Sequence, residues 1–121
     1  MPEKTTGFAS PAMGYEESRI DLNSLYINNP AATFFLRMES DEMAALGLPR
    51  GSLLIVDRSV EPSPNRLVWI QHEGQFLCRL MVKKNGKTIF TNGKEDIKPI
   101  SGETEICGTV TAYVVSNDLP Y

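Results

Sequence analysis

The sequence predicts a mainly β domain, and three observations lead to that prediction. Short apolar runs rich in β-branched and aromatic residues alternate with turn-forming residues from residue 33 onward. The Asn-Gly pair at residues 85–86 is a strong hairpin signal, because both turn positions require a positive φ angle. The only candidate helical turns are short, and Pro30 and Gly47 end them.

Two parts of the chain are expected to differ in order. Residues 1–19 are rich in Pro, Gly, Ser and Thr without an apolar period, so we expect a mobile, extended N-terminal arm. Residues 20–121 are expected to form one domain. At its start, Asp21 or Asn23 is a candidate cap for a short helical turn before Pro30, and an extended segment is the alternative.

The remaining elements are predicted from their apolar patterns. In the first strand the alternation puts Phe34, Leu36 and Met38 on one face. In the last strand, Gly108 is expected to mark a bulge or bend. About seven short strands are typical of an all-β barrel or sandwich. The candidate strands are residues 33–39, 52–57, 66–70, 75–84, 87–92 and 105–115.

Composition limits the classes of function. A chain of 121 residues with 41% hydrophobic and 22% charged residues is long and apolar enough for one folded domain. No apolar run approaches the roughly 20 residues of a membrane helix, and the start lacks a signal peptide, so a cytoplasmic location is expected. The net charge of −3 argues against direct DNA binding, and the basic cluster at Lys83–Lys87 fits a soluble hairpin tip.

Metal and cofactor sites are not expected. Cys78 and Cys107 lie in strand-like segments and are interpreted as buried free thiols, because two cysteines do not make a disulfide framework. The single histidine, His72, is interpreted as a solvated loop residue. These three residues have no metal-ligand spacing.

Three segments carry a resemblance to a known family. Residues 7–37 (GFASPAMGYEESRIDLNSLYINNPAATFFLR), 51–59 (GSLLIVDRS) and 108–115 (GTVTAYVV) resemble UmuD-type proteins of the LexA-like self-cleaving peptidases. The resemblance extends over about residues 6–116. It implies a LexA-like, signal-peptidase-like fold of β-barrel type, homodimers, and a Ser–Lys dyad that cuts the protein's own arm before a glycine.

The resemblance fails at the dyad. Matching residues 40–43 (SDEM) to the family's Gly-Asp-Ser-Met puts Glu42 at the nucleophile position, and the family's lysine position falls on Arg79. An arginine stays protonated and cannot act as a base. The dyad is therefore expected to be lost, and the two residues are predicted to form an ion pair; the alternative is that both point into water.

Two further comparisons concern self-cleavage. The bond that matches the family's cleavage junction is Thr6–Gly7, and only six residues precede it, which suggests a chain that resembles the processed form. A rearranged dyad of Ser40 and Lys83 is a minor alternative. No intact catalytic residue, cofactor or metal is thus expected.

The resemblance implies an accessory role. The expected function is a non-catalytic UmuD-like subunit in SOS-type mutagenic DNA repair, which binds a Y-family (UmuC-like) translesion polymerase as a homodimer. The alternatives are a self-processing serine peptidase and a decoy that forms mixed dimers with an active UmuD-type relative. Contact with a RecA filament is left open. Residues 110–115 are a candidate dimer surface, with ordinary core as the alternative.

Overall fold

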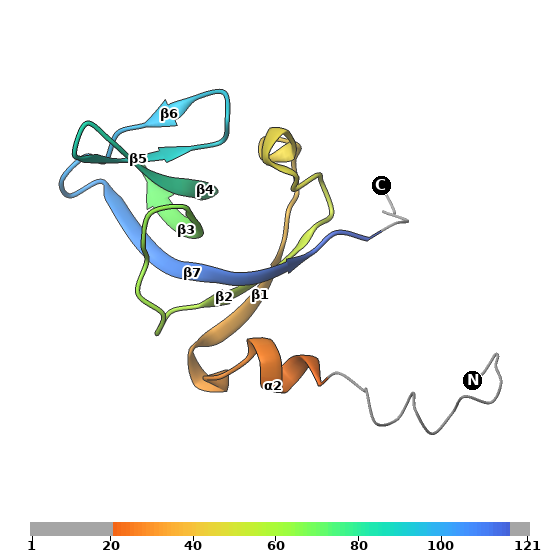
Figure 1. The fold of residues 1–121 in the computed structure, drawn as a ribbon. Helices are drawn as coiled ribbons and strands as arrows, with labels where there is room; N and C mark the ends of the chain where they lie inside the picture. Colours follow the sequence, from red (N-terminus) through yellow and green to blue (C-terminus); the bar gives the residue numbers. More distant parts are fainter. Residues whose placement is uncertain (1–20, 117–121) are drawn as a thin grey trace, which may run out of the picture.

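Seven antiparallel strands form a single sheet in the computed structural model, which describes residues 21–116 (Figure 1). Their order across the sheet is β1-β2-β7-β3-β4-β5-β6, so β1 and β6 are its edges. The prediction of a mainly β fold is confirmed. The predicted arm, residues 1–19, lies outside the described residues. The strands are β1 (Thr33–Arg37), β2 (Leu53–Asp57), β3 (Arg66–His72), β4 (Gln75–Lys84), β5 (Lys87–Thr91), β6 (Asp96–Ile97) and β7 (Thr104–Val114).

A short helix, α2 (Leu22–Tyr26), precedes the sheet. The Asp21 carboxylate caps it by accepting hydrogen bonds from the backbone N–H groups of Asn23 and Ser24. This confirms the predicted helical turn and selects Asp21 as its cap, whereas Asn23 lies inside the helix. A 3₁₀ turn, η1 (Pro30–Ala32), then leads into β1.

Two tight turns set the register of the central hairpins. Asn85 and Gly86 have φ angles of 52° and 77°, as the Asn-Gly signal predicted, and they join β4 to β5. Glu73 and Gly74, at 51° and 82°, join β3 to β4 in the same way. The sequence did not predict β6, because a strand of two residues has no readable alternation.

The long strand β7 connects the two halves of the sheet. It pairs with β2 through residues 109–114 and with β3 through residues 104–109. The register shifts on both sides, because Cys107 and Thr111 are each an extra residue on β7. The predicted irregularity near Gly108 is therefore confirmed. From Val110 onward, β7 has no strand partner on its β3 side within residues 21–116.

Two apolar clusters hold the sheet. The larger contains Met38, Met43 and Leu48 of the segment between β1 and β2, which packs on Leu54, Val56, Cys78 and Val110 of the strands. That segment includes a second 3₁₀ turn, η2 (Ala44–Leu46), which ends at Gly47 in a left-handed conformation. The smaller cluster is formed by Val68, Ile70 and Phe90. The larger cluster fixes the segment that carries Glu42.

The interpretation of His72 as a solvated loop residue was wrong. His72 is the last residue of β3, and its side chain is 14% exposed. Its Nδ1 lies 2.7 Å from the Thr104 hydroxyl on the neighbouring strand β7. The strand continues beyond its apolar residues because backbone pairing with Gln75 and Thr104 does not depend on the side chains that the sequence pattern reads.

Candidate functional site

Glu42 and Arg79 form an ion pair, as predicted. Arg79 Nη2 lies 2.7 Å from Glu42 Oε1. Arg79 comes from the middle of β4, and Glu42 comes from the turn between β1 and η2. The side chain of Arg79 is 7% exposed and that of Glu42 is 38% exposed, so the pair reaches from the interior to the surface. The alternative in which both charges point into water is excluded.

Each partner has a second anchor. The Ser40 hydroxyl donates a 3.0 Å hydrogen bond to Glu42 Oε2, which leaves Oε1 for the guanidinium. Arg79 Nη1 donates a 2.8 Å hydrogen bond to the carbonyl of Cys78. Arg79 Nε is buried and has no hydrogen-bond partner among the described residues. Both charges are therefore held in place, and one donor of the guanidinium is left unsatisfied.

The segment that carries Glu42 is locked at its base. Met38 and the residues of the returning chain exchange backbone hydrogen bonds of 2.8 Å, from Gly51 N–H to Met38 O and from Met38 N–H to Ser52 O. The Asp41 carboxylate also accepts a hydrogen bond from the backbone N–H of Arg50. The pair therefore sits on a braced loop, and its geometry is set by the fold.

The chemistry of this pair is unsuited to peptide hydrolysis. A guanidinium does not give up its proton in proteins and cannot activate a nucleophile. A carboxylate nucleophile suits glycosyl or phosphoryl transfer. In this structure the Glu42 carboxylate is already paired with the guanidinium of Arg79. Burial raises the pKa of the neighbouring Cys78 thiol to about 12, against an opposing effect of the Arg79 charge, so that thiol is protonated at neutral pH.

The rearranged Ser40–Lys83 dyad finds no support. The Ser40 hydroxyl is already hydrogen-bonded to Glu42. Lys83 is exposed and lies four residues beyond Arg79 on β4, which corresponds to roughly 13 Å along a strand. An exposed lysine lacks the desolvation that a lysine needs in order to act as a general base.

A cleft of about 420 Å³ adjoins the ion pair. Residues 36–40 and Glu42 form one wall, and residues 76–78 and Trp69 form the other. Trp69 and Phe76 are stacked in this wall, with ring centroids 6.0 Å apart and planes inclined by 9°. The cleft thus combines apolar and aromatic side chains with the charged Glu42, a combination that suits ligand binding.

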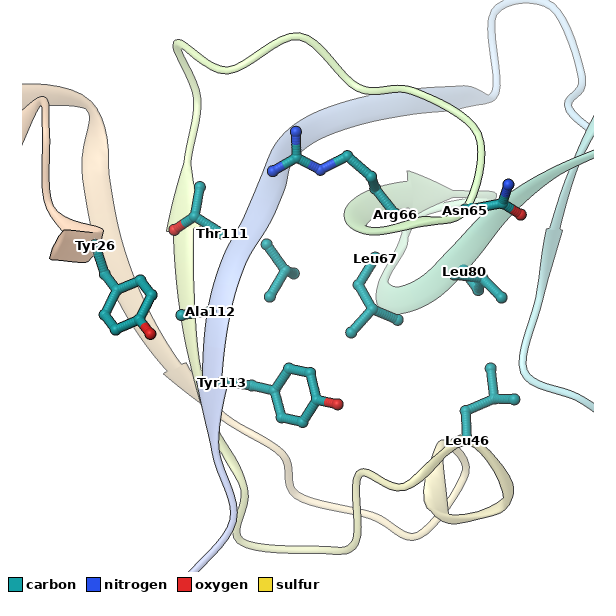
Figure 2. Close-up of a pocket in the computed structure, with 10 residues that line it drawn as sticks. Tyr26, Leu46, Asn65, Arg66, Leu67, Leu80, Thr111, Ala112 and Tyr113 are labelled. Carbon is teal, nitrogen blue, oxygen red and sulfur yellow. The ribbon is translucent and has the colours of Figure 1, made fainter.

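A second cavity lies away from the ion pair and follows the end of β7. It has a volume of about 590 Å³. Figure 2 shows Leu46 and Leu67 facing its centre. Tyr26 comes from α2 and Tyr113 from β7, and Arg66 lies across the cavity from Tyr113. This cavity lies on the side of β7 that has no strand partner, so a hollow with a mixed apolar and polar lining accompanies a free strand edge.

Other kinds of site find no structural support in the described part of the chain. Within residues 21–116, no group of three or more His, Cys, Asp or Glu side chains is arranged to hold a metal ion. None of the helices in the same range has the length and apolarity needed to cross a bilayer. Cys78 and Cys107 are free, as predicted, although Cys107 is only partly buried. The cleavage-junction candidates Thr6 and Gly7 lie outside the described residues.

The sequence identified the two charged residues but not what surrounds them. The resemblance of the chain to the family predicted both positions, and the opposite charges of the two residues predicted that they would pair. Nothing in the sequence indicated that Ser40 would hold the carboxylate or that Trp69 and Phe76 would stack. The stacking depends on strand register, which brings Trp69 opposite Cys78 and so next to Phe76, whereas the bond from Ser40 depends on the conformation of the loop that carries Glu42.

Comparisons with known proteins agree with this architecture. A family model described as Peptidase S24-like matches residues 2–111. The chain is similar to Protein SamA of Salmonella typhimurium strain LT2, with 34% identity over 108 residues, which are 89% of this chain and 77% of SamA. It is 42% identical over 76 residues to Protein ImpA of Escherichia coli, which are 63% of this chain and 52% of ImpA. It is 28% identical over 117 residues to Protein MucA of Escherichia coli, covering 93% of this chain and 80% of MucA.

The extent of these matches differs between relatives. The family model and SamA match most of the chain, including the positions of Glu42 and Arg79. The match to ImpA spans about half the length of that protein. The activities of these longer proteins therefore apply to this chain only as a proposal.

Proposed function

The chain belongs to the Peptidase S24-like family, in agreement with its UmuD-type, LexA-like resemblance, and from this membership we propose that it is a non-catalytic accessory subunit. In this proposal it works in the cytoplasm as a homodimer that binds a Y-family translesion polymerase during mutagenic DNA repair. Glu42 and Arg79 occupy the positions of the family's serine and lysine. The observation that carries the proposal is the ion pair between them.

The ion pair removes both chemical requirements of the family's reaction. The nucleophile position holds a carboxylate that is already engaged by a cation and a hydroxyl. The base position holds a cation that stays protonated. A scaffold that retains the fold without these two groups is suited to holding partners.

Homodimer formation has its own support. The free edge of β7 beyond Val110 offers unpaired backbone groups, and exposed apolar residues and a cavity lie beside it. A second copy approaching about a twofold axis can pair the same edge with itself, since antiparallel pairing is compatible with that symmetry. We therefore assign the dimer surface to Val110–Val115.

Restoring the dyad tests the assignment of the two positions. The variant Glu42→Ser/Arg79→Lys is incubated at alkaline pH and its mass is measured by mass spectrometry, next to the unaltered chain and the two single variants. We expect slow loss of the segment before Gly7 in the double variant alone, because only it supplies both a hydroxyl and a base. Cleavage of the unaltered chain would overturn the non-catalytic proposal.

Co-purification tests the accessory role. A tagged Y-family polymerase from the source organism is co-expressed with the chain, and stable co-elution in size-exclusion chromatography is expected. An active UmuD-type relative is co-expressed in a parallel experiment. Co-elution with that relative and not with the polymerase would favour the decoy function instead.

A further inference from the structure

The lysines of the chain are concentrated in one corner of the fold. Five of its six lysines lie within residues 83–98, and none of its six arginines does. That stretch carries only two acidic residues, so it is net positive in a chain whose net charge is −3. All five lysines are exposed. We define the basic corner as Lys83, Lys84, Lys87, Lys94 and Lys98.

The sheet brings together lysines from β4 and β5 and from the segments that flank β6. Lys84 pairs with Lys87 across the β4–β5 hairpin, and β6 continues directly into Lys98. Lys84, Lys87 and Lys98 line one open hollow of about 660 Å³, in which Ile89 and Pro99 supply apolar surface. The basic corner is therefore larger than the linear cluster at the hairpin tip, because folding adds Lys98.

Most of this positive charge is not neutralised by the protein itself. Lys84 Nζ lies 2.8 Å from Asp96 Oδ2, and hydrogen bonding from Lys84 lowers the pKa of Asp96. The other four lysines have no ion pair within residues 21–116. A cluster of like charges is unfavourable without a counter-charge, so the corner is suited to an anionic ligand.

The type of side chain identifies the ligand. Arginine, tyrosine and tryptophan are enriched in protein–protein interfaces, whereas lysine is depleted there. Lysine is a common contact for phosphate groups, which it meets as a point charge. The geometry points to the sugar–phosphate backbone of a nucleic acid, and we propose that the basic corner binds it without reading its sequence.

The corner also favours one form of nucleic acid. Single strands are commonly held by bases that stack on exposed aromatic rings. The aromatic residue of β5, Phe90, is 2% exposed and belongs to the smaller core cluster, so the corner has no stacking platform. A duplex has a higher phosphate density, so duplex DNA should bind more tightly than a single strand.

The position of the corner leaves the other proposed surface accessible. In Figure 1, β5 and β6 lie at the upper left, whereas the end of β7 emerges on the right. A dimer formed through β7 can therefore present two basic corners. The basic corner needs no polymerase, so failure of the polymerase experiment would leave it untouched, and the reverse also holds.

Fluorescence anisotropy of the purified full chain with a short labelled DNA duplex tests the proposal. We expect weak binding. The logarithm of the association constant should fall linearly with the logarithm of the salt concentration, with a slope near −3, or about −0.9 for each phosphate contacted. The variant Lys87→Gln/Lys98→Gln should lose about tenfold in affinity for each lysine near 0.1 M salt and reduce the slope by about 2.

Two further variants make the test specific. Arg50→Gln/Arg58→Gln removes the same net charge from exposed positions outside the corner and outside the cavity beside β7, and its affinity should change less than about twofold. Asp96→Asn should tighten binding severalfold, because it releases Lys84. The proposal is overturned if the two double variants lose affinity equally, if single-stranded DNA binds more tightly than the duplex, or if poly-glutamate of equal charge competes equally well.

Discussion

At the scale of single residues, the ion pair is unequal in its burial, and this decides what each substitution costs. Arg79 is almost enclosed, whereas more than a third of the Glu42 side chain is in contact with water. A carboxylate left alone can be hydrated at its surface position. A guanidinium left alone stays charged in the interior, where only the Cys78 carbonyl remains as a partner.

We expect Glu42→Gln to lower the free energy of unfolding by about 2 kcal/mol, less than the roughly 3–5 kcal/mol for a fully buried pair. Arg79→Met should cost less than about 1 kcal/mol, because an apolar side chain fills the site and also removes the unsatisfied Nε. Urea denaturation of the two variants measures both values. A larger loss for Arg79→Met than for Glu42→Gln would contradict this account.

The thiol of Cys78 makes stability depend on pH in the alkaline range. Burial raises its pKa from 9.0 to about 12, so the folded protein holds this proton more tightly than the unfolded chain does. The stabilisation is complete below pH 9 and is lost as the pH rises through that interval, by up to about 1.4 kcal/mol per pH unit. In urea titrations at a series of pH values, the free energy of unfolding should fall less steeply above pH 9 in Cys78→Ala, by nearly that amount per pH unit.

Cys107 provides the control for this measurement. Its pKa is also raised, by its smaller burial and by the nearby charge of Glu105, but the side chain is partly exposed. Cys107→Ala should therefore leave the alkaline decline close to that of the unaltered chain. An equal effect of both substitutions would show that burial of Cys78 is not the cause.

At the scale of elements, the crossing of β7 between β2 and β3 depends on one glycine. A Cβ atom added at Gly108 would lie 2.5 Å from Val56 Cγ1, and Val56 is completely buried on β2. Gly108→Ala should therefore lower the free energy of unfolding by about 2–3 kcal/mol, as overpacking of a core does. Thermal or urea unfolding measures the loss.

Two comparisons identify the cause of that loss. At Gly102 a Cβ atom would meet no atom within 4 Å, although the φ angle of 82° is unfavourable for alanine, so Gly102→Ala should cost only about 1 kcal/mol. The double variant Gly108→Ala/Val56→Ala should lose less stability than the sum of the losses of the two single variants, because Val56→Ala removes the Cγ1 atom that the new Cβ would meet. Strict additivity would rule out the clash.

The same glycine shows how far the sequence could predict the fold. A glycine among β-branched residues indicated an irregularity, and the chain does bulge there. The sequence could not predict that a side chain at position 108 would clash with Val56, since that contact depends on the register between β2 and β7. In general, alternation and turn residues predicted the strands, whereas β6 and the pairing of His72 depend on contacts between strands and were missed.

The candidate site was predictable to a similar degree. A comparison of residue types at two family positions was enough to predict the Glu42–Arg79 pair. The bond from Ser40 and the orphaned Arg79 Nε required three-dimensional packing. Short-range patterns thus predict elements and charge complementarity predicts a pair, whereas the environment of the pair comes from the tertiary structure.

At the scale of the whole molecule, the end of β7 is exposed in a way that a single sheet does not explain. Successive residues of a strand point to opposite faces, so a covered face should bury every second side chain. Tyr113, Val114 and Val115 are 45%, 50% and 45% exposed, so neither face is covered there. Together with the unpaired edge beyond Val110, this is the surface at which a second copy would add a strand.

We therefore expect the chain to be a dimer by size-exclusion chromatography with light scattering, and Tyr113→Glu to convert it to a monomer. A charge placed in a buried apolar interface without a partner is unfavourable, and the twofold symmetry places it there twice. Phe35→Glu is the matched control, because Phe35 is a similarly exposed aromatic residue, at 54%, but lies on the edge strand β1 and away from the unpaired end of β7. A monomer from Phe35→Glu and a dimer from Tyr113→Glu would move the interface to β1, and the cavity beside Tyr113 would then need another explanation.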